Sequence, residues 1–301
     1  MNSTSPSLEL TTILQYGQAI KYADVAGITL LVYDHFLTFY QEATYIWPSG
    51  LQPVNALYHY SKYSCFIYII VTYFRAFTPV ALIGKHCRGL TIAAGWLHIL
   101  GTVSAQGIFA IRAWAIWGQG RNMAICLIVA FAILMGVGFA ALQLFVDSVK
   151  FRIEPFVNQN IRGCITIDAK AIFCVASWID LLVFETFLTG ILVTRGYQAY
   201  KNGGNTGLFN LVYRDGFIFY LIASGITIVT SILVSSLPSG LVLVTLFPVR
   251  VIHVTLSSRI LLHTRENANG KTHIFDEDGN AFSEVEFWHA SERISLRDSQ
   301  M

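Results

Sequence analysis

Apolar residues fill seven long runs along the chain, and polar or turn-forming residues separate each run from the next. A helix needs about 20 mainly apolar residues to cross a bilayer, and each run reaches about that length. The runs are continuous rather than alternating, which argues against the strands of a transmembrane barrel. The predicted spans cover residues 22–40, 55–77, 90–112, 123–145, 171–194, 217–237 and 241–262.

The connectors between the runs contain the glycine, proline and asparagine expected of turns. The connector at 237–240 is so short that the last two spans should form an antiparallel helical hairpin. We therefore predict an all-α fold, a polytopic membrane bundle of seven transmembrane helices over residues 22–262. Residues 1–21 form a short segment before the bundle, and residues 263–301 form a polar tail that we expect to be disordered.

Composition agrees with a membrane protein. Of the 301 residues, 54% are hydrophobic and only 13% are charged, whereas a soluble chain carries about 25% charged residues. The lipid bilayer is therefore the first partner that the sequence predicts. The net charge of +2 gives no support for binding to nucleic acid.

Loop cations lie almost equally on both sides of the predicted bundle, so they do not fix its orientation. Cys87 precedes the third span and Cys164 lies in the long loop after the fourth. This is the arrangement that ties the second outer loop to the third helix in seven-span receptors, and disulfides persist on the oxidising side of a membrane. Asn2 begins an Asn-Ser-Thr glycosylation sequon. Together these features favour an extracellular or lumenal N-terminus and a cytoplasmic tail.

Ionisable residues at membrane depth are costly and therefore informative. Asp34 in the first span and Lys62 in the second lie at matching depths, so we expect them to form an intramembrane ion pair. This pair would serve either as a structural link between the helices or as part of a proton or ion relay.

A second set of charges lies in the later spans. Arg250 and His253 are three residues apart and share a face of the seventh span. Glu185 in the fifth span matches their depth. We predict that Glu185, Arg250 and His253 line one polar cavity, with Asp180 nearer its outer mouth. Snorkelling or pairwise neutralisation of the charges is the alternative.

Several blocks of the sequence resemble a large family of fungal membrane proteins, known by a domain of unknown function numbered 6533. The most specific block spans about 22–63, and the family usually has arginine where this chain has Lys62. Further similar blocks are Arg112-Ala113-Trp114-Ala115, Tyr213-Arg214-Asp215-Gly216 and Ser257-Ser258-Arg259-Ile260-Leu261-Leu262. The resemblance implies a seven-span fungal membrane protein and names no ligand.

The seven spans and the placement of Cys87 and Cys164 favour a receptor-like sensor with a small-molecule ligand and a cytoplasmic signalling partner. A transporter or channel that uses the intramembrane charges is the alternative, and an accessory or scaffold membrane protein is the third hypothesis. We expect no enzymatic activity and no cofactor, because the sequence has no Gly-x-Ser-x-Gly elbow and no His-Glu-x-x-His metal motif. The expected location is the plasma membrane or an endomembrane.

Overall fold

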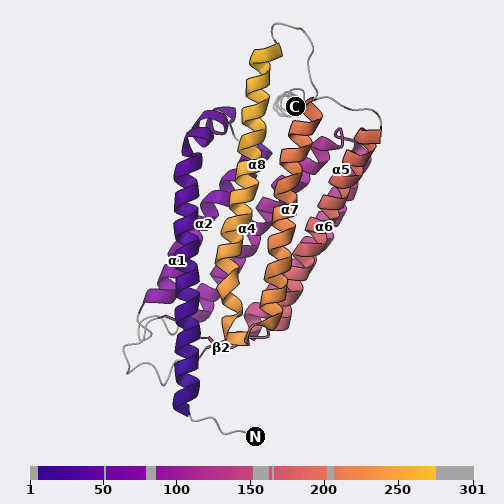
Figure 1. Cartoon of the computed structure of the whole chain (residues 1–301). Coiled ribbons are helices and arrows are strands. Elements are labelled where there is room, and N and C mark those ends of the chain that lie inside the picture. Colours follow the sequence, from indigo (N-terminus) through magenta and orange to yellow (C-terminus); the bar gives the residue numbers. More distant parts are fainter. Residues whose placement is uncertain are drawn as a thin grey trace, which may run out of the picture.

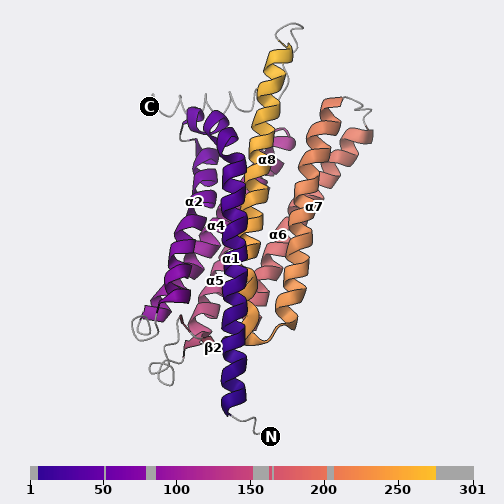
Figure 2. The same ribbon diagram turned by 60° about the vertical axis from the view of Figure 1, so that its left-hand side comes forward.

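The computed structural model describes residues 6–50, 52–78, 86–151, 163–164, 166–201 and 207–275. Within these residues, long helices run side by side along one common direction, as Figures 1 and 2 show. The helices are α1 (Pro6–Tyr45), α2 (Pro53–Phe77), α4 (Cys87–Ile116), α5 (Arg121–Ser148), α6 (Ala171–Lys201), α7 (Gly207–Ser236) and α8 (Leu246–Phe275). Two short 3₁₀ helices, η1 (Trp47–Ser49) and η4 (Ser239–Thr245), precede α2 and α8.

The bundle is all-α, as predicted, and a small β-ribbon that the sequence analysis did not predict lies beside it. Strands β1 (Lys150–Phe151) and β2 (Thr166–Asp168) pair in antiparallel fashion just after α5 and just before α6. The ribbon thus brings together the two ends of the long loop that carries Cys164.

Length and hydropathy identify five of the described helices as able to cross a membrane, which indicates a multi-pass membrane protein. These segments are Cys87–Ile116, Arg121–Ser148, Ala171–Gln198, Phe217–Ser236 and Leu241–Glu266. Helices α1 and α2 are long enough to span, but they are more polar: α1 contains Asp34, Thr38 and Glu42, and α2 contains Lys62.

Two helices extend beyond their predicted ends. Helix α1 begins at Pro6 rather than at residue 22, and proline is well tolerated in the first turn of a helix. Helix α8 continues past residue 263, where the polar tail was expected to begin, and reaches Phe275. Arg265 ties this extension to the bundle, because its guanidinium donates to the carbonyl oxygen of Tyr45 (2.7 Å) and to the side-chain oxygen of Asn55.

Helices α4 and α8 occupy the middle of the bundle. Helix α8 packs against α1, α2, α4 and α7, whereas α4 packs against α2, α5, α6 and α8. We call the end of the bundle near Cys87 and Cys164 the disulfide end, which is the lower end in Figure 1, and the other the opposite end. Helix α1 begins at the disulfide end and α8 terminates at the opposite end.

Apolar side chains fill the two halves of the bundle differently. In the half toward the opposite end, α4 contributes Phe109 and Ala113, α6 contributes Leu188 and Leu192, and α8 contributes Ile260 to one cluster of buried side chains. All five are at most 2% exposed. In the half toward the disulfide end, a cluster around Phe145, Trp178 and Leu243 surrounds a cavity.

Candidate functional site: a cavity at the disulfide end and two buried polar clusters

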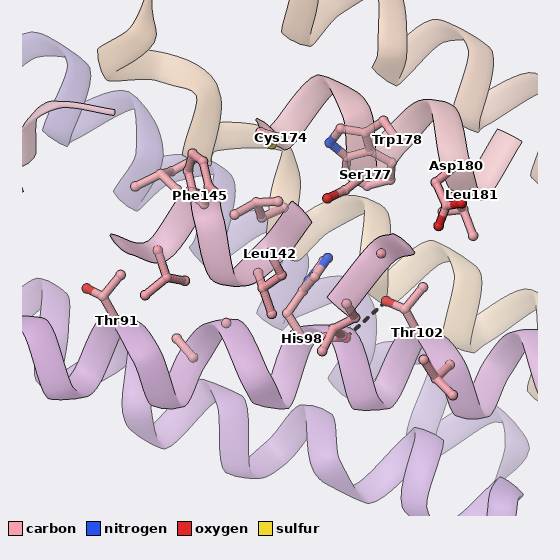
Figure 3. Close-up of a pocket in the computed structure, with 18 of the residues that line it drawn as sticks. Thr91, His98, Thr102, Leu142, Phe145, Cys174, Ser177, Trp178, Asp180 and Leu181 are labelled. Carbon is pink, nitrogen blue, oxygen red and sulfur yellow. Dashed lines mark hydrogen bonds between the residues drawn. The ribbon is translucent and has the colours of Figure 1, made fainter. Parts of the chain in front are cut away.

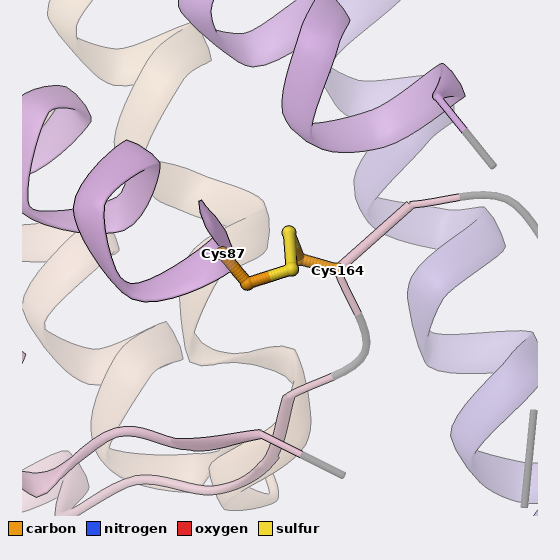
Figure 4. The surroundings of a disulfide bond; sticks show 2 residues. All are labelled: Cys87 and Cys164. Carbon is orange, nitrogen blue, oxygen red and sulfur yellow. A yellow bond between two sulfur atoms is a disulfide. The ribbon is translucent and has the colours of Figure 1, made fainter. Parts of the chain in front are cut away.

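Cys87 and Cys164 form a disulfide bond, which Figure 4 shows between the start of α4 and the loop after α5. Two backbone hydrogen bonds hold this loop segment against the end of α2: the amide of Gly163 donates to Thr78 O and that of Cys164 donates to Arg75 O, both at 2.8 Å. Gly163 has a φ of +96°, and a Cβ there would lie 2.6 Å from a carbonyl oxygen of α2. The close approach therefore requires glycine. Asn2 lies outside the described residues, so its glycosylation stays a prediction.

A cavity of about 90 Å³ lies just inside the disulfide end, and Figure 3 shows it between α4, α5 and α6. Its wall is mainly apolar, with Met135, Leu142 and Phe145 from α5 and Leu181 from α6. Arg75 of α2 lines it at the helix end that the Cys164 segment covers. The volume exceeds by several-fold what one water molecule occupies on this measure, so the cavity has room for a small organic molecule.

Three polar groups in the cavity wall have unsatisfied hydrogen-bonding atoms. Thr91 Oγ1 and His98 Nδ1 have no hydrogen-bond partner among the described residues. Trp178 Nε1 also has no hydrogen-bond partner among the described residues apart from a contact with the Cys174 thiol, which is a weak acceptor. The rings of His98 and Trp178 meet edge to face with centroids 6.4 Å apart, so these two side chains lie in one part of the cavity.

Among the described residues that line the cavity, Asp180 is the one that carries a carboxylate. Asp180 is 9% exposed, and its carboxylate makes no hydrogen bond or ion pair with any residue that the structure describes. Gly138 of α5 makes room for it, because a Cβ at that glycine would lie 3.1 Å from Asp180 Oδ2. Asp180 therefore lines a cavity, but a different one from that predicted, because Glu185, Arg250 and His253 are not among its lining residues and its wall is mainly apolar.

Farther from the disulfide end than the cavity, a buried polar cluster joins four helices. Gln106 Nε2 of α4 donates to Glu185 Oε1 of α6 at 2.8 Å, and His253 Nδ1 of α8 lies 3.2 Å from the same oxygen. Thr227 Oγ1 of α7 is 3.3 Å from His253 Nε2. All four residues are at most 3% exposed. We call this set the central cluster.

Arg250 does not join Glu185 and His253, so the predicted single polar cavity is not formed. Its guanidinium donates to Ser64 Oγ of α2 at 2.7 Å and lies over the Tyr68 ring, 5.2 Å from the centroid. A Cβ at Gly101 of α4 would lie 2.8 Å from Arg250 Cζ, so this glycine provides the space for the guanidinium. Spacing along α8 predicted the shared face correctly, but the long Arg250 side chain reaches α2 and α4 instead of α6.

The predicted Asp34–Lys62 ion pair is wrong. Lys62 Nζ of α2 donates to Glu42 Oε2 of α1 at 2.6 Å and to Thr38 Oγ1 at 2.9 Å. Asp34 instead accepts from Arg259 Nε of α8 at 2.8 Å. Asp34 and Glu42 belong to one stripe of α1, but Asp34 binds α8, the helix against which α1 mainly packs, whereas Glu42 binds α2.

Two tyrosines complete the surroundings of Glu42, which is 0% exposed. Tyr58 and Tyr63 donate their hydroxyls to its two carboxylate oxygens at 3.2 and 2.7 Å. We call Thr38, Glu42, Tyr58, Lys62 and Tyr63 the α1–α2 network.

Sequence reasoning missed Glu42 as the partner of Lys62 and Arg259 as the partner of Asp34, because both lay at or beyond the expected ends of their spans. One signal was available: Asp34, Thr38 and Glu42 follow one another at intervals of four residues and so share a helix face. No comparable signal identified Gln106 and Thr227, whose roles depend on which helices meet.

Comparison with known proteins gives one match. Residues 22–67 are similar to a family of unknown function, DUF6533. No curated protein and no solved structure matches the chain. The matched segment runs from the middle of α1 into α2 and contains every residue of the α1–α2 network.

Proposed function

We propose that this protein is a seven-span, receptor-like sensor of the fungal membrane family that its sequence resembles. Its disulfide end would face the outside or a lumen, and its opposite end would face the cytoplasm and a signalling partner. The observation that carries the proposal is the cavity beside the disulfide, together with the tightly packed side chains of the other half. Binding sites in helical bundles lie between helices and are largely apolar with a few polar groups.

The contacts suggest how occupancy of the cavity would reach the opposite end. Helix α6 contributes Asp180 to the cavity and Glu185 to the central cluster, so a shift of α6 acts on both. Farther along, Trp117 Nε1 donates to Ile191 O of α6 at 3.0 Å, and Arg112 of α4 donates to Ile260 O of α8 at 2.9 Å. A ligand that favours one arrangement of these helices over another would thereby change the cytoplasmic surface.

A transporter is the second candidate, and the central cluster is the observation that favours it. Glu185 and His253 form a buried carboxylate–imidazole contact, and Glu185 Oε2 and Gln106 Oε1 have no partner in the described part of the chain. Such groups at membrane depth are typical of proton relays.

Two measurements separate the candidates. Cys126 is exposed and lies near the start of α5 at the opposite end, whereas Cys65 and Cys174 are buried, so a thiol-reactive fluorophore should label Cys126 selectively. A receptor should show a ligand-dependent change of this fluorescence in vesicles without accompanying ion or ligand flux. The Cys126→Ser variant, treated with the same fluorophore, is the control and should not be labelled. Flux that is lost in a Glu185→Gln variant would instead support transport.

A further inference from the structure

We propose that the cavity takes a small, mainly apolar organic amine whose protonated amino group pairs with Asp180. This inference rests on the proposed function, because it names the ligand class for the same cavity. Its starting point is the contrast between a mainly apolar wall and one carboxylate that no described residue neutralises.

The energetic argument is that an unpaired carboxylate within a bundle of membrane helices is unfavourable. Three other buried acids have partners: Lys62 binds Glu42, Arg259 binds Asp34, and Gln106 and His253 contact Glu185. Asp180 lacks such a partner although it is nine-tenths buried. A ligand cation would supply the missing charge, and an ammonium donates up to three hydrogen bonds.

The rest of the cavity suits the apolar body of such a ligand. Leu142, Met135 and Leu181 provide aliphatic contacts, and the Trp178 indole provides an aromatic surface that also interacts favourably with cations. Figure 3 shows the Asp180 carboxylate beside Leu181 at one end of the cavity, with Trp178 and His98 farther along it. The amino group of the ligand would thus lie at the Asp180 end of the cavity, and its apolar body would lie along the rest of the wall.

The test uses three probes with one skeleton: benzylamine, benzyl alcohol and toluene. Each is titrated against the purified full-length protein in detergent, and the rise in unfolding temperature gives an apparent Kd. We expect benzylamine to bind about tenfold or more tightly than toluene, the factor that a hydrogen bond to a charged group typically contributes. Stronger binding of benzyl alcohol than of benzylamine would mean that Asp180 is neutral, and would overturn the proposal.

One variant and its matched control test whether the amine binds at Asp180. Asp180→Asn should weaken benzylamine about tenfold or more and leave toluene within about twofold, because only the charge-assisted bond is lost. The matched control is Asp147→Asn, which removes a carboxylate of α5 that is exposed and pairs with Arg88. Equal affinity of the parent and Asp180→Asn for benzylamine would overturn the proposal.

Gly138→Ala provides an independent test, since it adds a methyl group against Asp180 Oδ2 without removing the charge. It should weaken benzylamine more than toluene. Gly136→Ala, two residues away on the same helix, is the control, because a Cβ there meets nothing within 4 Å. Equal effects of the two substitutions would contradict a ligand at Asp180, as would a lipid acyl chain found in the cavity of the purified protein.

The outcomes also separate this inference from the proposed function. If benzylamine binds through Asp180 but leaves the fluorescence at Cys126 unchanged, the ligand class holds and the receptor proposal fails. If a neutral probe changes that fluorescence while benzylamine does not bind, the receptor proposal holds and the ligand class fails.

Discussion

The α1–α2 network and the cavity at the disulfide end differ in whether their buried carboxylate has hydrogen-bond donors. In the network, Glu42 accepts from Lys62, Tyr58 and Tyr63, so each carboxylate oxygen has at least one donor. In the cavity, Asp180 has no donor among the described residues and is surrounded mainly by apolar side chains. The first arrangement fixes helices together, and the second leaves a group available for something that the chain does not supply.

This difference assigns different roles to charges that look alike in the sequence. A satisfied buried pair has strong geometric requirements, and removing one member leaves an uncompensated charge. An unsatisfied buried acid lowers stability unless a ligand or a proton neutralises it. Substitutions in the two regions should therefore change stability in opposite directions, and the following predictions test that contrast.

The largest effect is expected for Lys62→Met. It leaves Glu42 buried without its cation, and breaking a buried ion pair typically costs about 3–5 kcal/mol in the free energy of unfolding. Denaturant or thermal unfolding in detergent measures this cost. Arg88→Met, which breaks an exposed pair with Asp147, is the control and should cost at most about 1 kcal/mol. An unfolding midpoint equal to that of the parent would show that the network does not hold α1 to α2.

Removing the disulfide with Cys87→Ser and Cys164→Ser should cost about 2–4 kcal/mol, because the bond closes a loop between residues 77 positions apart. The release should also weaken benzylamine binding, since the Cys164 segment is hydrogen bonded to Arg75, which lines the cavity. Titration of the double variant measures both effects. Unchanged affinity together with lowered stability would uncouple the loop from the cavity.

Gly101→Ala should cost about 1–3 kcal/mol, the usual range for overpacking, because its methyl group would clash with the Arg250 guanidinium. Gly107→Ala on the same helix is the control, as its Cβ would make an ordinary 3.5 Å contact with Leu57. The difference between the two unfolding midpoints is the measurement. Two equal midpoints would mean that Arg250 moves away without cost.

The smallest effect, and one of opposite sign, is expected for Asp180→Asn without ligand. Replacing an unpaired buried carboxylate by a neutral amide should leave the unfolding free energy unchanged or raise it by up to about 1 kcal/mol. A loss of stability larger than about 1 kcal/mol would mean that Asp180 has a structural partner. The comparison between the two regions would then fail.

Helix positions followed from the sequence because burial in a membrane imposes long apolar runs. The predicted starts of α2 and α6 lie within two residues of those observed, at Pro53 and Ala171. The ends of α1 and α8 did not follow, because the polar residues there are held by contacts between distant segments, such as that of Arg265 with Asn55. Such contacts cannot be predicted from the local composition of the sequence.

For the site, the sequence alone determined which residues are chemically costly at membrane depth: Asp34, Lys62, Asp180, Glu185, Arg250 and His253 all carry charge or titrate within apolar runs. Only the tertiary structure decided their partners. Lys62 binds Glu42 and not Asp34, and Arg250 binds Ser64 and not Glu185. Depth along a helix can be counted from the sequence, but the partner depends on which faces meet and on where a glycine leaves space for a long side chain. These are properties of the packed bundle.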